Sequence, residues 1–231
     1  MEAMRSLRLG LLFPALVLVG REDSRGQGST ASYGLGYGLN FSNIAARFTY
    51  RGSYPDIRQV DFKNLEIQFF GKEGRSVRAA QLKNGSFKHS EMDGKTFLGA
   101  EELTLESVHY LTPPGVEPGL AVVLLKDFSV SGSSSQDEIA QVFEVSRRRL
   151  RVEQELQSDE HFSDSFPAHS FDESTKTLVM ETTHYLQGDA HCCVSAKDVI
   201  TLRWTGTRFE QASLQTELTE TGRSEGKKLT R

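Results

Sequence analysis

The run His191-Cys192-Cys193 is the most unusual local feature of the sequence, because it brings an imidazole and two thiols together. Adjacent Cα atoms lie about 3.8 Å apart, below the usual disulfide span of about 4.4–6.8 Å. A vicinal disulfide between Cys192 and Cys193 would therefore be strained and easily reduced. In an extended chain the two thiols point to opposite faces and can hardly bind one ion. Three interpretations stay open: a vicinal disulfide, a metal site that includes His184, or one buried and one exposed thiol.

Other patterns that carry chemistry are missing from the sequence. The histidines form no H-E-x-x-H zinc pair, and no G-x-S-x-G elbow presents a serine nucleophile. The segment 34–38 places its third glycine one position too early for a dinucleotide fingerprint, and neither a phosphate loop nor an EF-hand loop occurs. We therefore predict no catalytic residue, no metal ligands and no cofactor. Whether the protein is an enzyme stays open, and the sequence favours that it is not.

Composition excludes several classes of protein. The 231 residues include 27 Lys and Arg and 31 Asp and Glu, so the formal net charge is -4. This balance lacks the positive charge with which proteins neutralise nucleic-acid phosphates, so we exclude nucleic acid as a partner. Hydrophobic residues make up 37% of the chain, which is enough to bury a core. Two cysteines are too few for a disulfide-dense scaffold or a four-cysteine zinc site.

The N-terminus has the layout of a secretory signal. Arg5 and Arg8 precede an apolar run from Leu9 to Val19, which is too short to span a bilayer as a helix. We interpret residues 1–20 as a signal-like segment and predict export to a periplasmic or extracellular location. The alternative is an N-terminal apolar helix of a cytosolic protein. The best later apolar run has only six residues, 120–125, so we predict no integral membrane span after signal removal.

Residues 21–54 read as a Gly-rich linker or arm that contains one alternating strand, 33–41. Large apolar residues alternate there with glycine or asparagine, so an extended chain would place them all on one face: Tyr33, Leu35, Tyr37, Leu39 and Phe41. We interpret this segment as an edge strand or a flexible arm. A membrane-spanning strand has the same pattern, but it would need at least about seven more like it.

Residues 55–216 are predicted to form a single β domain. Leu65, Ile67 and Phe69 alternate with polar residues, as in a half-buried strand. Asn84-Gly85 is a strong hairpin signal, because both positions of that turn need positive φ. The continuous run 120–125 fits a strand that is covered on both faces at the centre of a sheet. Frequent turns and little helix predict an antiparallel sheet stack, either a sandwich or a propeller-like fragment.

Three later segments complete this organisation. Residues 131–136 are predicted to be a loop. Residues 138–156 fit either a helix or a hairpin turning near 147–149, and we favour the hairpin. The arginines of that turn form a basic cluster, which we interpret as a solvated tip flanked by Glu144 and Glu153 rather than a binding patch. From 217 to 231 the polar sequence predicts a disordered tail.

Four segments together resemble a group of exported bacterial proteins of unknown function: 60–64 (VDFKN), 82–85 (LKNG), 188–193 (GDAHCC) and 203–209 (RWTGTRF). Members of that group begin with a V-D-F-x-N strand and end with G-D-x-C-C-P followed by W-x-G-x-x-F. Val194 stands where the group has proline. The resemblance implies a structural signature and no known activity; its residues here are Asp189, His191, Trp204, Gly206 and Phe209.

Taken together, these features predict an exported, non-catalytic β domain that binds an unknown protein or another component of the cell envelope. The alternative is a thiol redox protein that uses Cys192 and Cys193. The ligand and the oligomeric state do not follow from the sequence.

Overall fold

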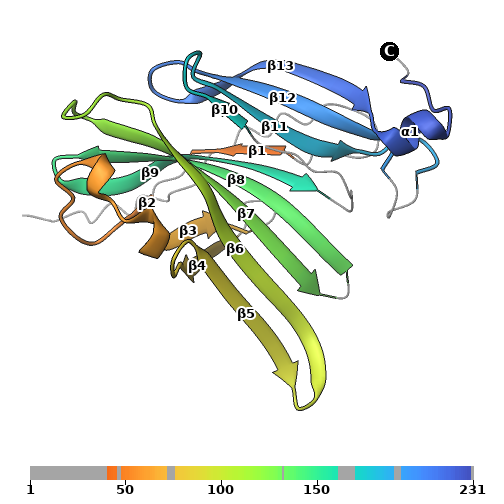
Figure 1. Ribbon diagram of the computed structural model, residues 1–231, viewed down its shortest axis with the longest axis horizontal. Coiled ribbons are helices and arrows are strands. Elements are labelled where there is room, and N and C mark those ends of the chain that lie inside the picture. The colour runs from red at the N-terminus through yellow and green to blue at the C-terminus, as the bar shows by residue number, and fades with distance from the viewer. Residues whose placement is uncertain are drawn as a thin grey trace, which may run out of the picture.

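The computed structural model of the protein describes residues 41–45, 48–71, 76–131, 133–160, 170–189 and 194–229. The described chain is mostly β, with antiparallel sheets and almost no helix, so the predicted fold class is confirmed (Figure 1). The signal-like segment and the alternating strand as far as residue 40 lie outside the described residues. Within the described part, no helix has the length and apolarity needed to cross a bilayer.

A seven-stranded antiparallel sheet forms the centre of the structure. Its strand order is β1-β9-β8-β7-β6-β5, and β2 also pairs with β9. From β5 to β9 each strand pairs with the next one along the chain, so this part is a simple meander. The strands of this sheet are β1 (Phe41–Ile44), β2 (Phe48–Thr49), β5 (Ser86–Asp93), β6 (Thr96–Tyr110), β7 (Gly119–Ser131), β8 (Ser133–Ser146) and β9 (Arg149–Glu160).

Strand β7 is apolar on both faces because both faces of the central sheet are covered. Leu120, Val122 and Leu124 belong to one hydrophobic cluster. The side chains between them, Ala121, Val123 and Leu125, belong to a second cluster on the opposite face. This alternation confirms the prediction that 120–125 is a central strand, since each face of a strand meets a different layer.

The first outer layer is a two-stranded sheet, β3 (Glu66–Phe70) and β4 (Val77–Gln81), preceded by two short 3-10 helices, η1 (Ile57–Gln59) and η2 (Phe62–Asn64). Ile67 and Phe69 point inward from β3, as the sequence alternation predicted. They pack in one cluster with Leu125, Ile139 and Phe143 of the central sheet. This layer therefore buries one face of the meander near its middle.

The second outer layer is a four-stranded sheet with the order β10-β11-β12-β13. Figure 1 shows it in blue above the green central strands. Leu178, Met180 and Ile200 of this sheet pack against Val122 and Leu124 of β7. The elements are β10 (Ser170–Asp172), β11 (Thr177–His184), β12 (Ala196–Trp204), β13 (Phe209–Leu218) and the short helix α1 (Glu220–Ser224).

Side chains of the central sheet complete the buried outer edge of β3. The Phe70 N–H donates to Glu155 Oε1 at 2.9 Å, and Gln157 Nε2 donates to the Phe70 carbonyl at 2.6 Å. Gln141 Nε2 likewise donates to the Gln68 carbonyl at 2.7 Å. Backbone groups that are buried without partners are strongly unfavourable. These three side chains therefore take the place of a missing neighbouring strand.

Gln154 does the same for the second outer layer. Its Oε1 accepts a hydrogen bond from the Phe209 N–H, and its Nε2 donates to the Phe209 carbonyl, both at 2.8 Å. The same Nε2 donates to Asn43 Oδ1 at 2.9 Å. One buried amide thereby joins β1, β9 and the first residue of β13.

The turns agree with the sequence in two places and differ in a third. Arg147 and Arg148 have φ of 50° and 62° and join β8 to β9, which confirms the hairpin interpretation of 138–156. The turn at Asn84-Gly85 also forms, with φ of 54° and 89°, but it connects β4 and β5, which belong to different sheets. Residues 131–136 were predicted to be a loop, and that is wrong, because β7 and β8 remain paired as far as Ser131 and Ser133.

The domain borders also differ from the prediction at both ends. Strands β1 and β2 pair with β9, so residues 41–54 belong with the β domain rather than with a linker. At the other end, β13 extends to Leu218 and α1 follows, where the sequence predicted a disordered tail. The polar composition of 217–229 predicted disorder, but the segment is ordered by polar contacts, such as those of Thr219 with Ser195 and of Lys227 with Asp189.

We expect Gln154→Leu to lower the free energy of unfolding by about 2–4 kcal/mol. The substitution leaves the N–H and the carbonyl of Phe209 buried without partners, at about 1–3 kcal/mol each. Chemical denaturation followed by circular dichroism measures the change. Gln215→Leu, at an exposed position of β13, is the matched control and should stay within about 0.5 kcal/mol. A loss no larger than that of the control would contradict the role given to Gln154.

We also expect Glu155 to make stability depend on pH. Burial raises its pKa from 4.5 to about 7, against the opposing effect of the hydrogen bonds from Gln141, Phe70 and Gln157. Between these values the folded protein keeps a proton that the unfolded chain releases, so stability falls as the pH rises from 4.5 to 7. The whole effect amounts to about 3 kcal/mol.

Glu155→Gln should remove this slope, whatever constant offset it adds to the stability. Denaturation midpoints measured across that pH range test the expectation. Glu217→Gln, at an exposed position of β13, should keep the slope of the native protein. Parallel curves for the native protein and Glu155→Gln would show that Glu155 does not titrate in this range.

Candidate functional site

The predicted signature falls on two connections of the second outer layer. The first is the loop between β11 and β12, and the second is the turn between β12 and β13. His191, Cys192 and Cys193 lie outside the described residues, so the three interpretations of the cysteine pair stay predictions. The residues that flank them, Asp189 and Val194, are described and define the base of this loop.

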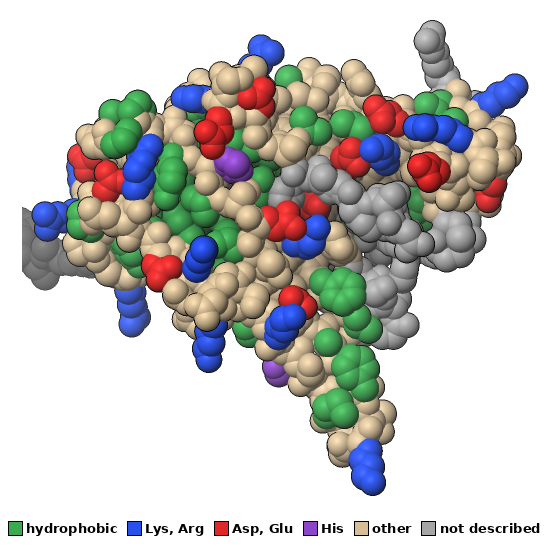
Figure 2. Space-filling model, in the orientation of Figure 1, with side chains coloured by type: hydrophobic (Ala, Val, Ile, Leu, Met, Phe, Trp, Pro, Cys, Tyr) green, Lys and Arg blue, Asp and Glu red, His purple; other side chains and the backbone are tan. Residues whose placement is uncertain are grey.

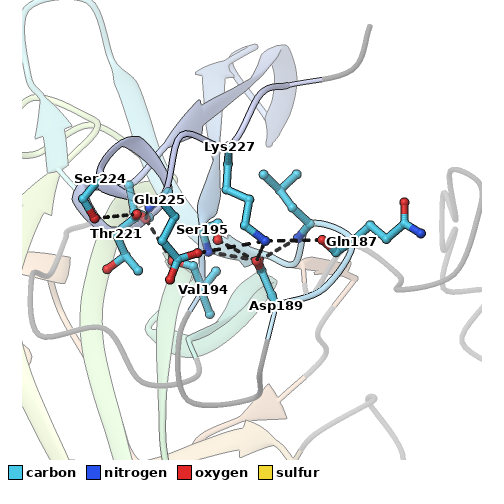
Figure 3. Close-up of polar contacts among 11 residues, drawn as sticks. Gln187, Asp189, Val194, Ser195, Thr221, Ser224, Glu225 and Lys227 are labelled. Carbon is cyan, nitrogen blue, oxygen red and sulfur yellow. Dashed lines mark hydrogen bonds and ion pairs between the residues drawn. The ribbon is translucent and has the colours of Figure 1, made fainter.

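The carboxylate of Asp189 holds the two sides of the loop together. Its Oδ2 accepts from the N–H groups of Leu186 and Ser195 at 2.8 and 3.0 Å, and its Oδ1 accepts from Ser195 Oγ at 2.5 Å. Lys227 Nζ lies 3.3 Å from Oδ1 (Figure 3). Only 1% of the Asp189 side chain is exposed. We call Leu186, Asp189, Ser195 and Lys227 the Asp189 clamp.

The electrostatics of the clamp favour an ionised carboxylate. Burial acts to raise the pKa of Asp189, but the hydrogen bonds from Ser195 and Leu186 and the contact with Lys227 outweigh it, so the pKa lies below its ordinary value. A carboxylate held in this way is a fixed anchor rather than a proton donor near neutral pH. The Asp189 of the predicted signature therefore has a structural part in this loop.

The C-terminal segment packs on the same loop. The Thr219 N–H donates to the Ser195 carbonyl at 3.0 Å, and Thr219 Oγ1 donates to the Val194 carbonyl at 2.9 Å. A Cβ on Gly222 would overlap the carbonyl oxygen of Ser195, so glycine alone fits there. Helix α1 thus packs directly on Val194 and Ser195, which follow the cysteines and precede β12. The sequence offered no sign of this contact, because 195 and 222 are far apart in the chain.

The other signature residues build the turn between β12 and β13. Gly206 has φ of +103°, which favours glycine at this position. Trp204 and Phe209 pair across the turn with ring centroids 5.2 Å apart, and both contact the apolar cluster of the second outer layer. Trp204 therefore anchors the rim of this cluster. These residues support the fold of the turn and of the cluster beside it.

Two histidine and carboxylate pairs involve the second outer layer. His184 Nδ1 lies 2.9 Å from Asp198 Oδ2, and Thr216 Oγ1 donates to Asp198 Oδ1 at 2.6 Å. His109 Nδ1 lies 3.0 Å from Glu173 Oε1. A carboxylate can orient an imidazole for proton transfer. Within the described ranges, however, no group of three His, Cys, Asp or Glu side chains is arranged to hold a metal ion.

One end of the central sheet extends beyond both outer layers (Figure 1). We call it the overhang; it comprises residues 88–93 of β5, residues 96–100 of β6 and residues 128–131 of β7. Large apolar side chains are exposed there: Met92 54%, Phe97 52%, Leu98 46% and Phe128 39%. Figure 2 shows hydrophobic side chains in green on the projecting hairpin. The sequence analysis missed this surface. The Asp93-Gly94 dipeptide could have indicated a hairpin here, with Met92 and Phe97 paired on either side of its turn.

Three of these side chains share one face of the sheet. Met92 pairs directly with Phe97 across the β5–β6 hairpin. Phe128 of β7 lies opposite Glu102 of β6, which in turn lies opposite Lys88 of β5. Lys88 and Met92 are four residues apart in the same strand and therefore share a face. Phe128 thus lies on the same face of the sheet as Met92.

Along β7, Phe128 continues the row of apolar residues that the four-stranded sheet covers, namely Leu120, Val122 and Leu124. The overhang therefore continues this face beyond the four-stranded sheet. Lys126 lies between Leu124 and Phe128 in the row, and the Lys88–Glu102 ion pair shares the face with Met92.

The outer edge of β5 is an open strand edge. Ser86 turns its N–H and carbonyl away from β6, because both bond to Lys83. Backbone groups of a strand alternate in direction with a period of two, so those of Lys88 and Ser90 also point outward. In the described part of the chain no strand pairs with this edge beyond the bridge at Ser86. The overhang thus combines an open strand edge with an exposed apolar face.

The basic cluster lies at the β8–β9 turn, where Arg147, Arg148 and Arg149 are exposed. Next to them, Arg151 contacts Glu144 at 2.6 Å and Glu153 at 2.5 Å. The interpretation of this turn as a solvated tip flanked by these two glutamates agrees with the structure.

Comparison with known protein families, with curated proteins and with solved structures found no match for this chain. The resemblance to exported bacterial proteins therefore stays a prediction from the sequence. The function has to be argued from the surfaces that the structure presents.

We expect Gly222→Ala to displace α1 from the loop. The added methyl group cannot occupy the position of the Ser195 carbonyl, so the two hydrogen bonds of Thr219 should be lost, at about 1 kcal/mol each. Amide hydrogen exchange should then speed up at Thr219 and at Lys227, whose N–H bonds to Gly222. Thr221→Ala, at an exposed position of the same helix, is the control. Unchanged protection in Gly222→Ala would show that the helix does not depend on this contact.

Proposed function

We propose that the protein is an exported, non-catalytic interaction module that binds an extended strand of a partner protein along β5. The observation that carries this proposal is the overhang, where an open strand edge lies beside exposed apolar side chains. Export is supported by the signal-like arrangement of residues 1–20.

The chemistry of the overhang selects the kind of partner. The outward backbone groups of Lys88 and Ser90 can be satisfied together by another strand, which supplies donors and acceptors at the same spacing. Met92 and Phe97 lie at the end of this edge and offer apolar contact on one face only. The opposite face of β5 carries His89 and Glu91. A fitting partner is therefore an extended segment with large apolar side chains on one side.

The exposed edge of β5 and the apolar side chains beside it support an interaction site. Proteins usually protect a long edge strand with charges, bulges or a covering element, because an open edge pairs with other chains. Here Lys88, Glu91 and Asp93 place charges on the edge strand itself. The hairpin also has one bulge in β6, where Leu98 is the extra residue opposite the step from Glu91 to Met92, and Leu98 adds exposed apolar surface. An apolar patch beside an open edge is typical of an interaction site.

The thiol redox alternative has one supporting observation. The Asp189 clamp fixes both ends of the short segment that carries Cys192 and Cys193. A fixed loop is what a reactive dithiol pair requires. Titration of the native protein with a thiol reagent tests this function, because two inert thiols and no reducible disulfide would exclude it.

We expect an end-blocked octapeptide that alternates leucine with threonine to bind the protein, measured by fluorescence anisotropy. Ser90→Pro removes one outward N–H and should weaken binding about tenfold, and Phe97→Asp should do the same by removing apolar contact. Ser90→Ala keeps the N–H and is the matched control. A peptide of the same length with proline in place of threonine should not bind. If the octapeptide fails to bind, or binds all variants equally, the proposal is wrong.

A further inference from the structure

We infer that the strand completing β5 is the alternating segment 33–40 of a second copy of this chain, so that copies assemble head to tail. This inference rests on the proposed function and names the partner of the same edge. The argument combines the pattern of this segment with the register of β1, the width of the central sheet and the chemistry of the overhang.

The pattern of the segment matches the two faces of the overhang. When extended, 33–40 places Tyr33, Leu35, Tyr37 and Leu39 on one face and only glycine or Asn40 on the other. Paired with β5, the large side chains would continue the surface of Met92 and Phe97. The glycine face would lie on the side of His89 and Glu91, where it adds no apolar surface to a polar face. No other segment of the sequence has this one-sided pattern over eight residues.

The register of β1 ties this segment to one side of the central sheet. In β1, Phe41 pairs with Ser158 in antiparallel register. Continuing that register would place residues 40 and 39 opposite Asp159 and Glu160, the last residues of β9 that the structure describes. Within the described residues, β9 therefore offers a partner to only two residues of the segment.

The β5 strand of the same chain is too far away to pair with this segment. Five interstrand steps separate β1 from β5 in the order of the central sheet. At about 4.8 Å per step the two edges lie about 24 Å apart. Crossing this width takes about seven extended residues at about 3.5 Å each, which would use up the segment itself. The arm can therefore reach β5 only on a neighbouring copy.

Each copy then has one donor arm and one acceptor edge at opposite sides of the same sheet. Such a contact joins two different surfaces, so it repeats from copy to copy and forms either a closed ring of two or more copies or an open chain. The central sheets of successive copies would be continuous through the inserted strands.

The full chain tests this inference in sedimentation velocity. We expect species larger than one chain whose proportion rises with protein concentration. Tyr37→Asp in the arm and Ser90→Pro at the edge should each give a monomer, whereas Ser90→Ala should assemble like the native protein. Circular dichroism and thermal melting of Ser90→Pro check its fold, because its N–H is not used inside the sheet.

Mixing the two monomeric variants provides the decisive measurement. Tyr37→Asp keeps an intact edge and Ser90→Pro keeps an intact arm, so the mixture should form a pair of twice the mass of one chain and nothing larger. A synthetic peptide of residues 33–40 should dissociate the native assembly. A native chain that stays monomeric at every concentration, or a mixture that stays monomeric, would overturn the inference.

The two proposals fail differently. If the native chain is monomeric but the leucine–threonine octapeptide still binds in a manner sensitive to Ser90→Pro, the strand site exists and its partner is another protein. If neither the octapeptide nor the 33–40 peptide binds, the strand site itself is refuted.

Discussion

The structure depends on satisfying strand edges that are buried between layers. Both outer sheets turn backbone groups toward the central sheet, and a buried N–H or carbonyl without a partner is costly. Four side chains of β8 and β9 meet this requirement: Gln141, Gln154, Glu155 and Gln157. These hydrogen bonds allow the two outer sheets to pack against the central sheet and so bury the apolar cluster on each face of β7. The overhang differs because its outer edge receives no such side chain within the described residues.

Much of the fold could be predicted because it follows from local pattern. The two-sided run of 120–125, the alternation at Ile67 and Phe69 and the turn at Arg147 each depend on neighbouring residues alone. The errors arose where partners are distant. The Asn84-Gly85 turn itself forms as predicted, but the strands on either side of it do not pair with each other. The backbone of Gly85 bonds elsewhere: its N–H donates to Lys63, and its carbonyl accepts from Leu105.

The site was only partly predictable for the same reason. The sequence drew attention to Asp189, Trp204, Gly206 and Phe209, and the structure gives all four a supporting part in the second outer layer. It could not show that Lys227 returns to Asp189, since the two are joined by an ion pair across a long stretch of chain. The overhang was missed because it depends on strand length. Strands β5, β6 and β7 extend past the outer sheets, and no local sequence pattern indicates where the covering sheets end.

The meander has a consequence for the order in which the protein forms. Strands β5 to β9 each pair with a neighbour in sequence, so ribosomal synthesis supplies every strand of this part of the sheet by residue 160. The β10–β13 layer is made later, and until then the row Leu120, Val122 and Leu124 faces water. A nascent chain therefore exposes an apolar surface for a time, and this is the stage at which a chaperone would protect it from aggregation.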